Sequence, residues 1–197
     1  LSTIVAVLIG LSWGYMRGFL GEVVGFIVNL FLVIPGLPLM IVIAAYLQNG
    51  GILMIIAVIV ITGWAWGARV LRSQTQSLRG NDFVTSAQFS GDSRARIVFR
   101  EILPNMTSII AGTLFGAATA AILAEAGLEF LGLGDSSIVS WGTMLYWAQN
   151  SNSLLTGQWL LLFAPGLCIA LLALSLTLIN FGVDGISNPR LREGKGR

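Results

Sequence analysis

Histidine is absent from this 197-residue chain, and charged residues are scarce. Only 10% of the residues are charged, whereas about 25% is usual for a soluble globular domain. Without histidine, the chain has no imidazole metal ligand and no histidine base for catalysis. Cys168, the single cysteine, lies inside an apolar run and has no second cysteine to pair with. We therefore expect no metal site, no catalytic residues and no disulfide within this sequence.

The chain contains two long stretches without any charged residue. Hydrophobic residues make up 55% of the chain, and the mean hydropathy is +0.84. No charged residue occurs in 23–68 or in 136–183. Since about 20 apolar residues cross a bilayer as a helix, each run has room for about two crossings, or for one crossing plus a dipping loop. The alternation typical of membrane strands is absent, so the sequence predicts an all-α, polytopic membrane protein.

The predicted membrane spans follow from these runs. We place five of them, at about residues 1–16, 26–47, 52–71, 106–124 and 159–181. The second contains Pro35 and Pro38, each of which removes a helix hydrogen bond, so we expect that span to be kinked.

The basic residues predict how the spans are oriented. If the C-terminus is cytoplasmic, all 11 Lys and Arg residues fall in the inside segments or at the inner end of the third span, and the outside segments 48–51 and 125–158 hold none. With five spans, Leu1 would then lie outside, so we expect at least one further span before it and about six in the full-length protein. The predicted organisation is a membrane domain over 1–181, with a cytoplasmic loop at 72–105 and an external loop at 125–158, followed by a basic cytoplasmic tail at 182–197.

The cytoplasmic loop contains a compact, charge-rich stretch. Asn81 or Asp82 can start a short helix, and Gly91 can close it in the left-handed conformation. Asp92 or Ser93 can then cap a second helix, which we expect to end before Pro104. Residues 82–93, called the knob below, thus have a shape that another protein could dock on, with Phe83 and Phe89 as apolar anchors. The alternative is an ordinary loop between spans.

Several motifs in a fixed order carry a family resemblance over nearly the whole chain. They are GYMRGFLGE at 14–22, VIPGLPLM at 33–40, SLRGNDFV at 77–84, REILPN at 100–105, AILAEAGLEFLGLG at 121–134, SWGTML at 140–145 and NPRLR at 188–192. Together they resemble the permease subunits of ABC importers, in particular the second (C-type) permease of the dipeptide, oligopeptide and nickel uptake family. The resemblance implies the type I ABC importer permease fold and a multi-pass location in a prokaryotic inner membrane.

The resemblance also implies a role for the knob. The Glu-Ala-Ala of the family's coupling loop, the EAA loop, falls on Thr85, Ser86 and Ala87, and the loop's glycine on Gly91. Thr85 and Ser86 depart from the pattern, so the implied docking depends on shape more than on an ion pair from the missing glutamate. In the family this loop contacts the ATP-binding subunit. The residues implied in ATPase coupling are Phe83, Val84, Thr85, Ser86, Ala87, Gly91, Asp92 and Arg94.

Two acidic residues lie near the outer end of the fourth predicted span. Glu125 and Glu129 are one helical turn apart and share a face, and acidic groups at membrane depth are costly. With Trp141 of the aromatic-rich external segment, we expect them to line the translocation pathway or to contact a solute-binding protein; the alternative is a hydrated helix end. At the inner surface, Glu22 and Arg17 are expected to form a charge pair.

The function predicted from the resemblance is that of an importer subunit, not of an enzyme. No GxxxxGK[ST] phosphate loop occurs, so ATP and Mg would bind only to partner subunits. The implied partners are a sister permease, one or two ATP-binding subunits, an extracytoplasmic solute-binding protein and the lipid bilayer, with no nucleic acid. The substrate would be a peptide, a nickel complex or an oligosaccharide.

Other classes of protein fit the sequence less well. An ATP-independent secondary transporter would need charged relays at mid-span, and the span centres contain none. An intramembrane hydrolase would need a histidine or a buried aspartate pair. A membrane assembly protein stays open on composition alone, but the motifs count against it.

Overall fold

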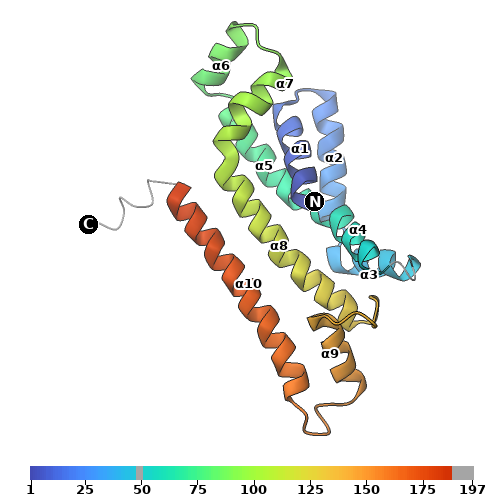
Figure 1. Ribbon diagram of the computed structural model, residues 1–197. Helices are drawn as coiled ribbons and strands as arrows, with labels where there is room; N and C mark the ends of the chain where they lie inside the picture. Colours follow the sequence, from blue (N-terminus) through green and yellow to red (C-terminus); the bar gives the residue numbers. More distant parts are fainter. Residues whose placement is uncertain (48–50, 188–197) are drawn as a thin grey trace. The chain divides into compact units, whose positions relative to one another are not determined.

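The computed structural model describes residues 1–47 and 51–187, and all regular structure in these residues is helical (Figure 1). This confirms the predicted all-α class. In chain order the helices are α1 (Ser2–Tyr15), α2 (Phe19–Val33), α3 (Gly36–Tyr46), α4 (Gly51–Gly63), α5 (Ala65–Leu78), α6 (Asp82–Phe89), α7 (Arg94–Arg96), the π-helix η1 (Ile97–Ile102), the 3₁₀ helix η2 (Leu103–Met106), α8 (Thr107–Phe130), α9 (Trp141–Asn150) and α10 (Leu160–Ser187).

The described residues form two compact units. The first contains residues 1–34 and 63–114 and the described residues from 180 onward; the second contains residues 35–62 and 115–179. Helices α8 and α10 each contribute residues to both units. Much of the predicted tail, including the NPRLR motif at 188–192, lies outside the described residues.

The apolar helices follow the predicted spans in order, but fewer of them than the five predicted are long enough to cross a membrane. Among the residues that the structure describes, three helices are long and apolar enough to cross a membrane: Gly51–Leu78, Arg94–Phe130 and Leu160–Val183. A fourth span is obtained if α2 and α3 count as one, and α1 is a shorter apolar helix. The fourth predicted span, 106–124, is the middle of a longer helix, so Glu125 and Glu129 lie within the helix and not beyond it.

The expected kink in the second span is a complete break. Helix α2 ends at Val33, and Ile34 and Pro35 both have extended backbone, with ψ values of 126° and 117°. A residue before proline is pushed out of the helical region, which accounts for the position of the break. Pro38 falls in the first turn of α3, where a helix needs no backbone donor, so it is accommodated without a second break.

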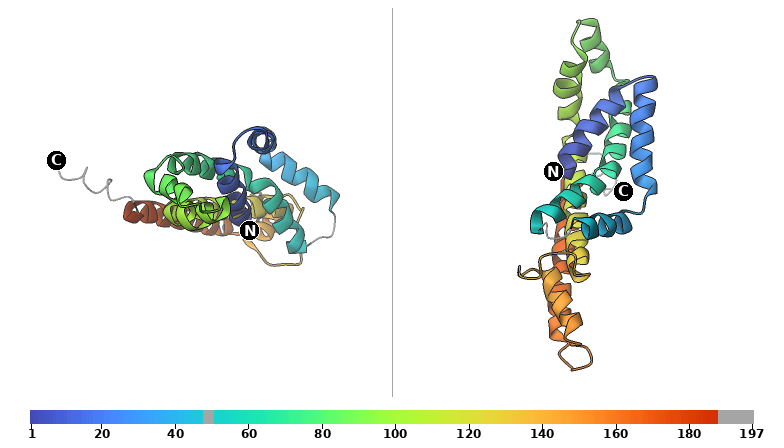
Figure 2. Two further views of the ribbon diagram at one scale, coloured as in Figure 1. Left: turned by 90° about the horizontal axis from the view of Figure 1, so that it is seen from above. Right: turned by 90° about the vertical axis from the view of Figure 1, so that its right-hand side faces the viewer.

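The first unit is built around α1 and α5, with α2 beside them (Figures 1 and 2). Two glycines of α1, one helical turn apart, allow the helices to approach closely. A Cβ added to Gly10 would lie 2.8 Å from the backbone oxygen of Ala68, and one added to Gly14 would lie 2.5 Å from Thr75 Cβ. Small residues permit such packing between membrane helices.

Replacing Gly14 with alanine is expected to destabilise the first unit by about 1–3 kcal/mol, the usual cost of overpacking. The added methyl group would also meet the backbone oxygen of Arg72 at 2.9 Å, which cannot rotate away. Thermal unfolding of the purified protein in detergent measures the effect. Gly116→Ala is the matched control, because no atom lies within 4 Å of a Cβ there. Equal melting temperatures for the two variants would contradict the expectation.

The helix after the knob does not end before Pro104, so that prediction was wrong. Residues Arg94–Phe130 form one continuous helix that includes Pro104. The π-helical turns of η1 precede the proline and widen the helix where the pyrrolidine ring would otherwise meet a carbonyl. Asn105 Nδ2 donates to the backbone oxygen of Glu101 at 2.7 Å. The knob is therefore joined to a membrane helix without an intervening loop.

The second unit has a small apolar core. Ala44 of α3, Met54, Ile55 and Val58 of α4 and Leu128 of α8 are buried together. Helix α9 packs close to the end of α8, since a Cβ on Gly142 would lie 2.9 Å from Ala126 Cα.

Candidate functional site

The knob has the predicted form of a helix, a glycine turn and a second helix. Gly91 has φ +82°, its N–H donates to the oxygen of Gln88 at 3.1 Å, and the N–H of Asp92 donates to the oxygen of Ala87 at 3.1 Å. This pair of bonds is the Schellman arrangement that ends a helix at a left-handed residue. Ser93 then caps the next helix by accepting from the Arg96 N–H at 3.3 Å.

The two faces of α6 have different surroundings. Val84 is fully buried in the core of the first unit, and Phe83 and Ala87 pack against the same core. On the opposite face Thr85 and Phe89 are exposed, Phe89 by 88%. Of the two predicted anchors, therefore, Phe89 is the one fully exposed to a partner, whereas half-buried Phe83 packs against its own unit.

The predicted coupling residues fall into an exposed group and a buried group. Thr85, Ser86, Gly91 and Arg94 are exposed, whereas Val84 is inaccessible. Asp92 is half-buried, and its Oδ1 lies 3.3 Å from Arg96 Nε. A solvent-exposed pair of this i,i+4 type contributes about 0.3–0.5 kcal/mol. The shape of the knob, rather than this charge pair, is therefore the main feature that a partner protein would contact.

A second group of residues connects α8 to α9. Glu129 is buried, and its carboxylate accepts a hydrogen bond from the Ser140 hydroxyl. Ser140 caps α9 by accepting from the Thr143 N–H at 3.1 Å, and Thr143 Oγ1 accepts from the Ser140 N–H at 2.9 Å. Gly142 leaves space for this contact, because a Cβ there would lie 2.6 Å from Glu129 Oε2. The buried carboxylate thus holds the start of α9 against α8.

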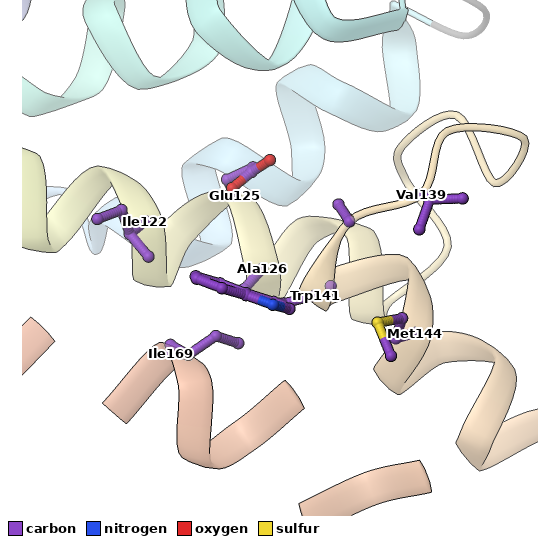
Figure 3. Close-up of a pocket in the computed structure, with 9 residues that line it drawn as sticks. Ile122, Glu125, Ala126, Val139, Trp141, Met144 and Ile169 are labelled. Atoms are coloured by element: carbon purple, nitrogen blue, oxygen red, sulfur yellow. The ribbon is translucent and has the colours of Figure 1, made fainter. Parts of the chain in front are cut away.

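A cavity of about 330 Å³ lies beside this connection (Figure 3). Its lining includes half-buried Glu125 of α8, Trp141 and Met144 of α9, and Ile169 of α10. In Figure 3 the Glu125 carboxylate points away from the indole of Trp141, so the two side chains border the cavity in different directions. Two of the three predicted pathway residues, Glu125 and Trp141, therefore share a cavity, whereas Glu129 faces Ser140.

The turn between α8 and α9 is closed by its own hydrogen bonds. Asp135 Oδ1 accepts from the Ser137 hydroxyl at 2.6 Å and from the Ser137 N–H at 3.0 Å. These bonds to the ionised form hold the pKa of the Asp135 carboxyl below its ordinary value. Asp135 therefore stays charged at neutral pH and stabilises the turn.

Comparison with known proteins identifies the family. The sequence profile described as "Binding-protein-dependent transport system inner membrane component" matches residues 6–193. The chain belongs to this family. Its members are membrane components of transport systems, which agrees with the apolar helices and with the predicted family resemblance.

Named relatives of this permease family include peptide transport proteins. The oligopeptide transport system permease protein OppC of Bacillus subtilis is 31% identical over 98% of this chain and 63% of its own length. The dipeptide transport system permease protein DppC of the same species is 29% identical over 98% of the chain and 61% of its own length. A putative peptide transport system permease protein of Brucella suis is 39% identical over 64% of the chain and 42% of its own length. The chain thus spans less than two thirds of these permeases.

Sequence reasoning missed part of the site in this chain. Ser140 and Gly142 contact Glu129, and Thr143 completes the cap with Ser140, yet only the spacing of Ser140 and Thr143 indicates a helix start in the sequence. The close approach of Gly142 to α8 has no signal in the sequence, because it depends on how the chain turns between the two helices.

Proposed function

We propose that the chain is part of a transmembrane permease subunit of an ATP-driven importer of peptides. The family membership and the relatives named as oligopeptide and dipeptide permeases support this proposal. The observation that carries it is the knob: α6 is fixed to the core through Val84 and presents the exposed Phe89 on its other face. A separate ATPase subunit would dock on that exposed face.

The proposed mechanism follows from the way the knob is attached. ATP binding closes the ATPase subunits, and their movement displaces α6 together with the core around Val84. The continuous helix Arg94–Phe130 extends from the knob to the end of α8 and carries the displacement into the membrane. Coupling requires the contact at α6 to differ in free energy between the outward-open and inward-open states.

The cavity beside Glu125 and Trp141 is proposed to form part of the translocation pathway. Placing a half-buried carboxylate at the end of a membrane helix costs free energy, which makes Glu125 a candidate functional residue. Glu129 would act indirectly, by holding α9 next to this cavity. We propose a cytoplasmic C-terminus because of the distribution of the basic residues. The proposed partners are a sister permease, one or two ATP-binding subunits and an extracytoplasmic solute-binding protein.

The proposal is tested by co-expressing the full-length protein with its neighbouring transport genes and reconstituting the purified complex in liposomes. We expect a sister permease and ATP-binding subunits to co-purify, and labelled peptide to accumulate only with ATP and the solute-binding protein. Peptide accumulation driven by an ion gradient without ATP would refute the ATP-driven mechanism.

Replacing Phe89 with alanine is expected to weaken ATPase binding by about tenfold or more, because truncating a buried aromatic anchor commonly costs over 1.4 kcal/mol. Pull-down of the ATP-binding subunit by the tagged permease measures the loss. Phe99→Ala is the matched control, since Phe99 is 48% exposed but lies outside α6. An equal loss in both variants would show that exposed phenylalanine in general, and not the knob, mediates binding.

A further inference from the structure

We propose that a basic cavity beside the knob binds a phosphate group. The cavity measures about 380 Å³ and lies within the first unit. It is bordered by the end of α1, the residue after α5, helix α6 and the start of α7. Its polar lining consists of Tyr15, Arg17, Arg79, Gln88, Asp92 and Arg94.

The cavity carries an excess of positive charge. Three arginines and one aspartate line it, and the carboxylate of Asp92 pairs with Arg96, which lies outside the lining. Among the side chains that the structure describes, no carboxylate lies within 4.0 Å of the guanidinium of Arg17, Arg79 or Arg94. The expected pair between Arg17 and Glu22 is therefore not formed. The three guanidinium groups are left to attract an anion.

The hydrogen-bond donors are held in place by neighbouring groups. Arg79 Nη1 donates to the backbone oxygen of Tyr15 at 3.1 Å, which orients its guanidinium and leaves further N–H groups free. Tyr15 Oη accepts from Gln88 Nε2 at 3.3 Å, so its own hydroxyl proton is available to a ligand. Guanidinium groups match phosphate oxygens in a two-pronged geometry, and phosphate has acceptor oxygens for donors from several sides. These donors therefore fit a phosphate group.

The surroundings of Arg17 favour a phosphate that belongs to a membrane lipid. Phe19 and Leu20 follow it closely and are 76% and 67% exposed, and Met16 precedes it at 41%. Such side chains are suited to the acyl region of a bilayer, with Arg17 at the level of the headgroups. A soluble phosphate would have the same chemistry. The site goes beyond the proposed function, because binding there requires no transport.

Lipid retention by the purified full-length complex tests the site. The complex is reconstituted in nanodiscs of phosphatidylcholine with added phosphatidylglycerol, and retained phosphatidylglycerol is measured by native mass spectrometry. We expect Arg17→Gln to reduce retention about tenfold, as for the loss of one charge-assisted contact, and Arg17→Lys to reduce it less. Arg100→Gln is the matched control: Arg100 is exposed, lies in η1 and does not line the cavity.

The outcomes separate the sources of the ligand. Retention of phosphatidylglycerol that inorganic phosphate does not displace supports a lipid headgroup, whereas displacement by inorganic phosphate supports a soluble anion in the same cavity. Equal retention by wild type, Arg17→Gln and Arg17→Gln/Arg94→Gln would overturn the proposal, as would an equal loss in Arg100→Gln. If the Arg17 variants fail to assemble, Tyr15→Phe removes one donor from the cavity, and unchanged retention in that variant would likewise overturn it.

Discussion

Replacing Gly91 with valine is expected to separate ATP hydrolysis from peptide uptake. Gly91 has φ +82°, which a β-branched residue avoids at a cost of about 1–2 kcal/mol. No atom lies within 4 Å of a Cβ built there, so the strain is conformational and not steric. Valine would relieve it by breaking the bonds from residue 91 and Asp92 to Gln88 and Ala87, which would turn α6 relative to the ATPase.

The amount of peptide imported per ATP hydrolysed, measured in proteoliposomes, is expected to fall about tenfold. A tenfold change corresponds to a free-energy difference of ~1.4 kcal/mol. Gly91→Asn should retain most coupling, because asparagine tolerates the left-handed conformation. Gly80→Val is the matched control, since Gly80 lies next to the same helix without a left-handed backbone. If Gly91→Val imports peptide with the normal ratio, the shape of the knob does not control coupling.

Replacing Gly142 with alanine is expected to detach α9 from α8. The added methyl group would lie 2.6 Å from Glu129 Oε2 and 2.9 Å from Ala126 Cα, and the second of these atoms belongs to the backbone. Overpacking costs about 1–3 kcal/mol, and a buried carboxylate left without its Ser140 donor costs about 1–3 kcal/mol more. We therefore expect a total destabilisation of about 2–6 kcal/mol and loss of the cavity beside Trp141.

Thermal unfolding and limited proteolysis of the detergent-purified protein measure this loss. Gly127→Ala on the facing helix α8 is the control, because no atom lies within 4 Å of a Cβ at that position. Glu129→Gln separates the contribution of the buried charge from that of overpacking, since it keeps the size and a hydrogen-bonding group while removing the charge. A Gly142→Ala protein with unchanged melting and cleavage would show that α9 is not held by this contact.

The local features of the knob were predictable because they depend on neighbouring residues. Gly91 ends α6 in the left-handed conformation, and Ser93 caps the next helix, as their positions in the sequence indicate. Pro104 was misread, because a proline normally ends a helix and nothing in the sequence announces the π-helical turns that accommodate it. The outcome at Pro104 depends on how the preceding helix packs against the first unit.

Other assignments needed the tertiary structure because they depend on which face of a helix is buried. Phe83 and Phe89 are equivalent by composition, but α6 turns Phe83 toward the core and leaves Phe89 exposed. Glu125 and Glu129 are also equivalent by spacing, yet only Glu125 borders the cavity. Residues on one helical face can differ in this way when an adjacent segment, here the start of α9, covers one and not the other.

The amino-acid sequence by itself determined the class of protein, the order of the apolar helices and the family, because hydropathy and short motifs are local properties of the chain. The tertiary structure decided which predicted residues can meet a partner, which hold the fold, and where Tyr15, Arg17 and Arg79 meet the knob. Those relations join residues far apart in the sequence, and they arise only when α1, α5 and α6 pack together.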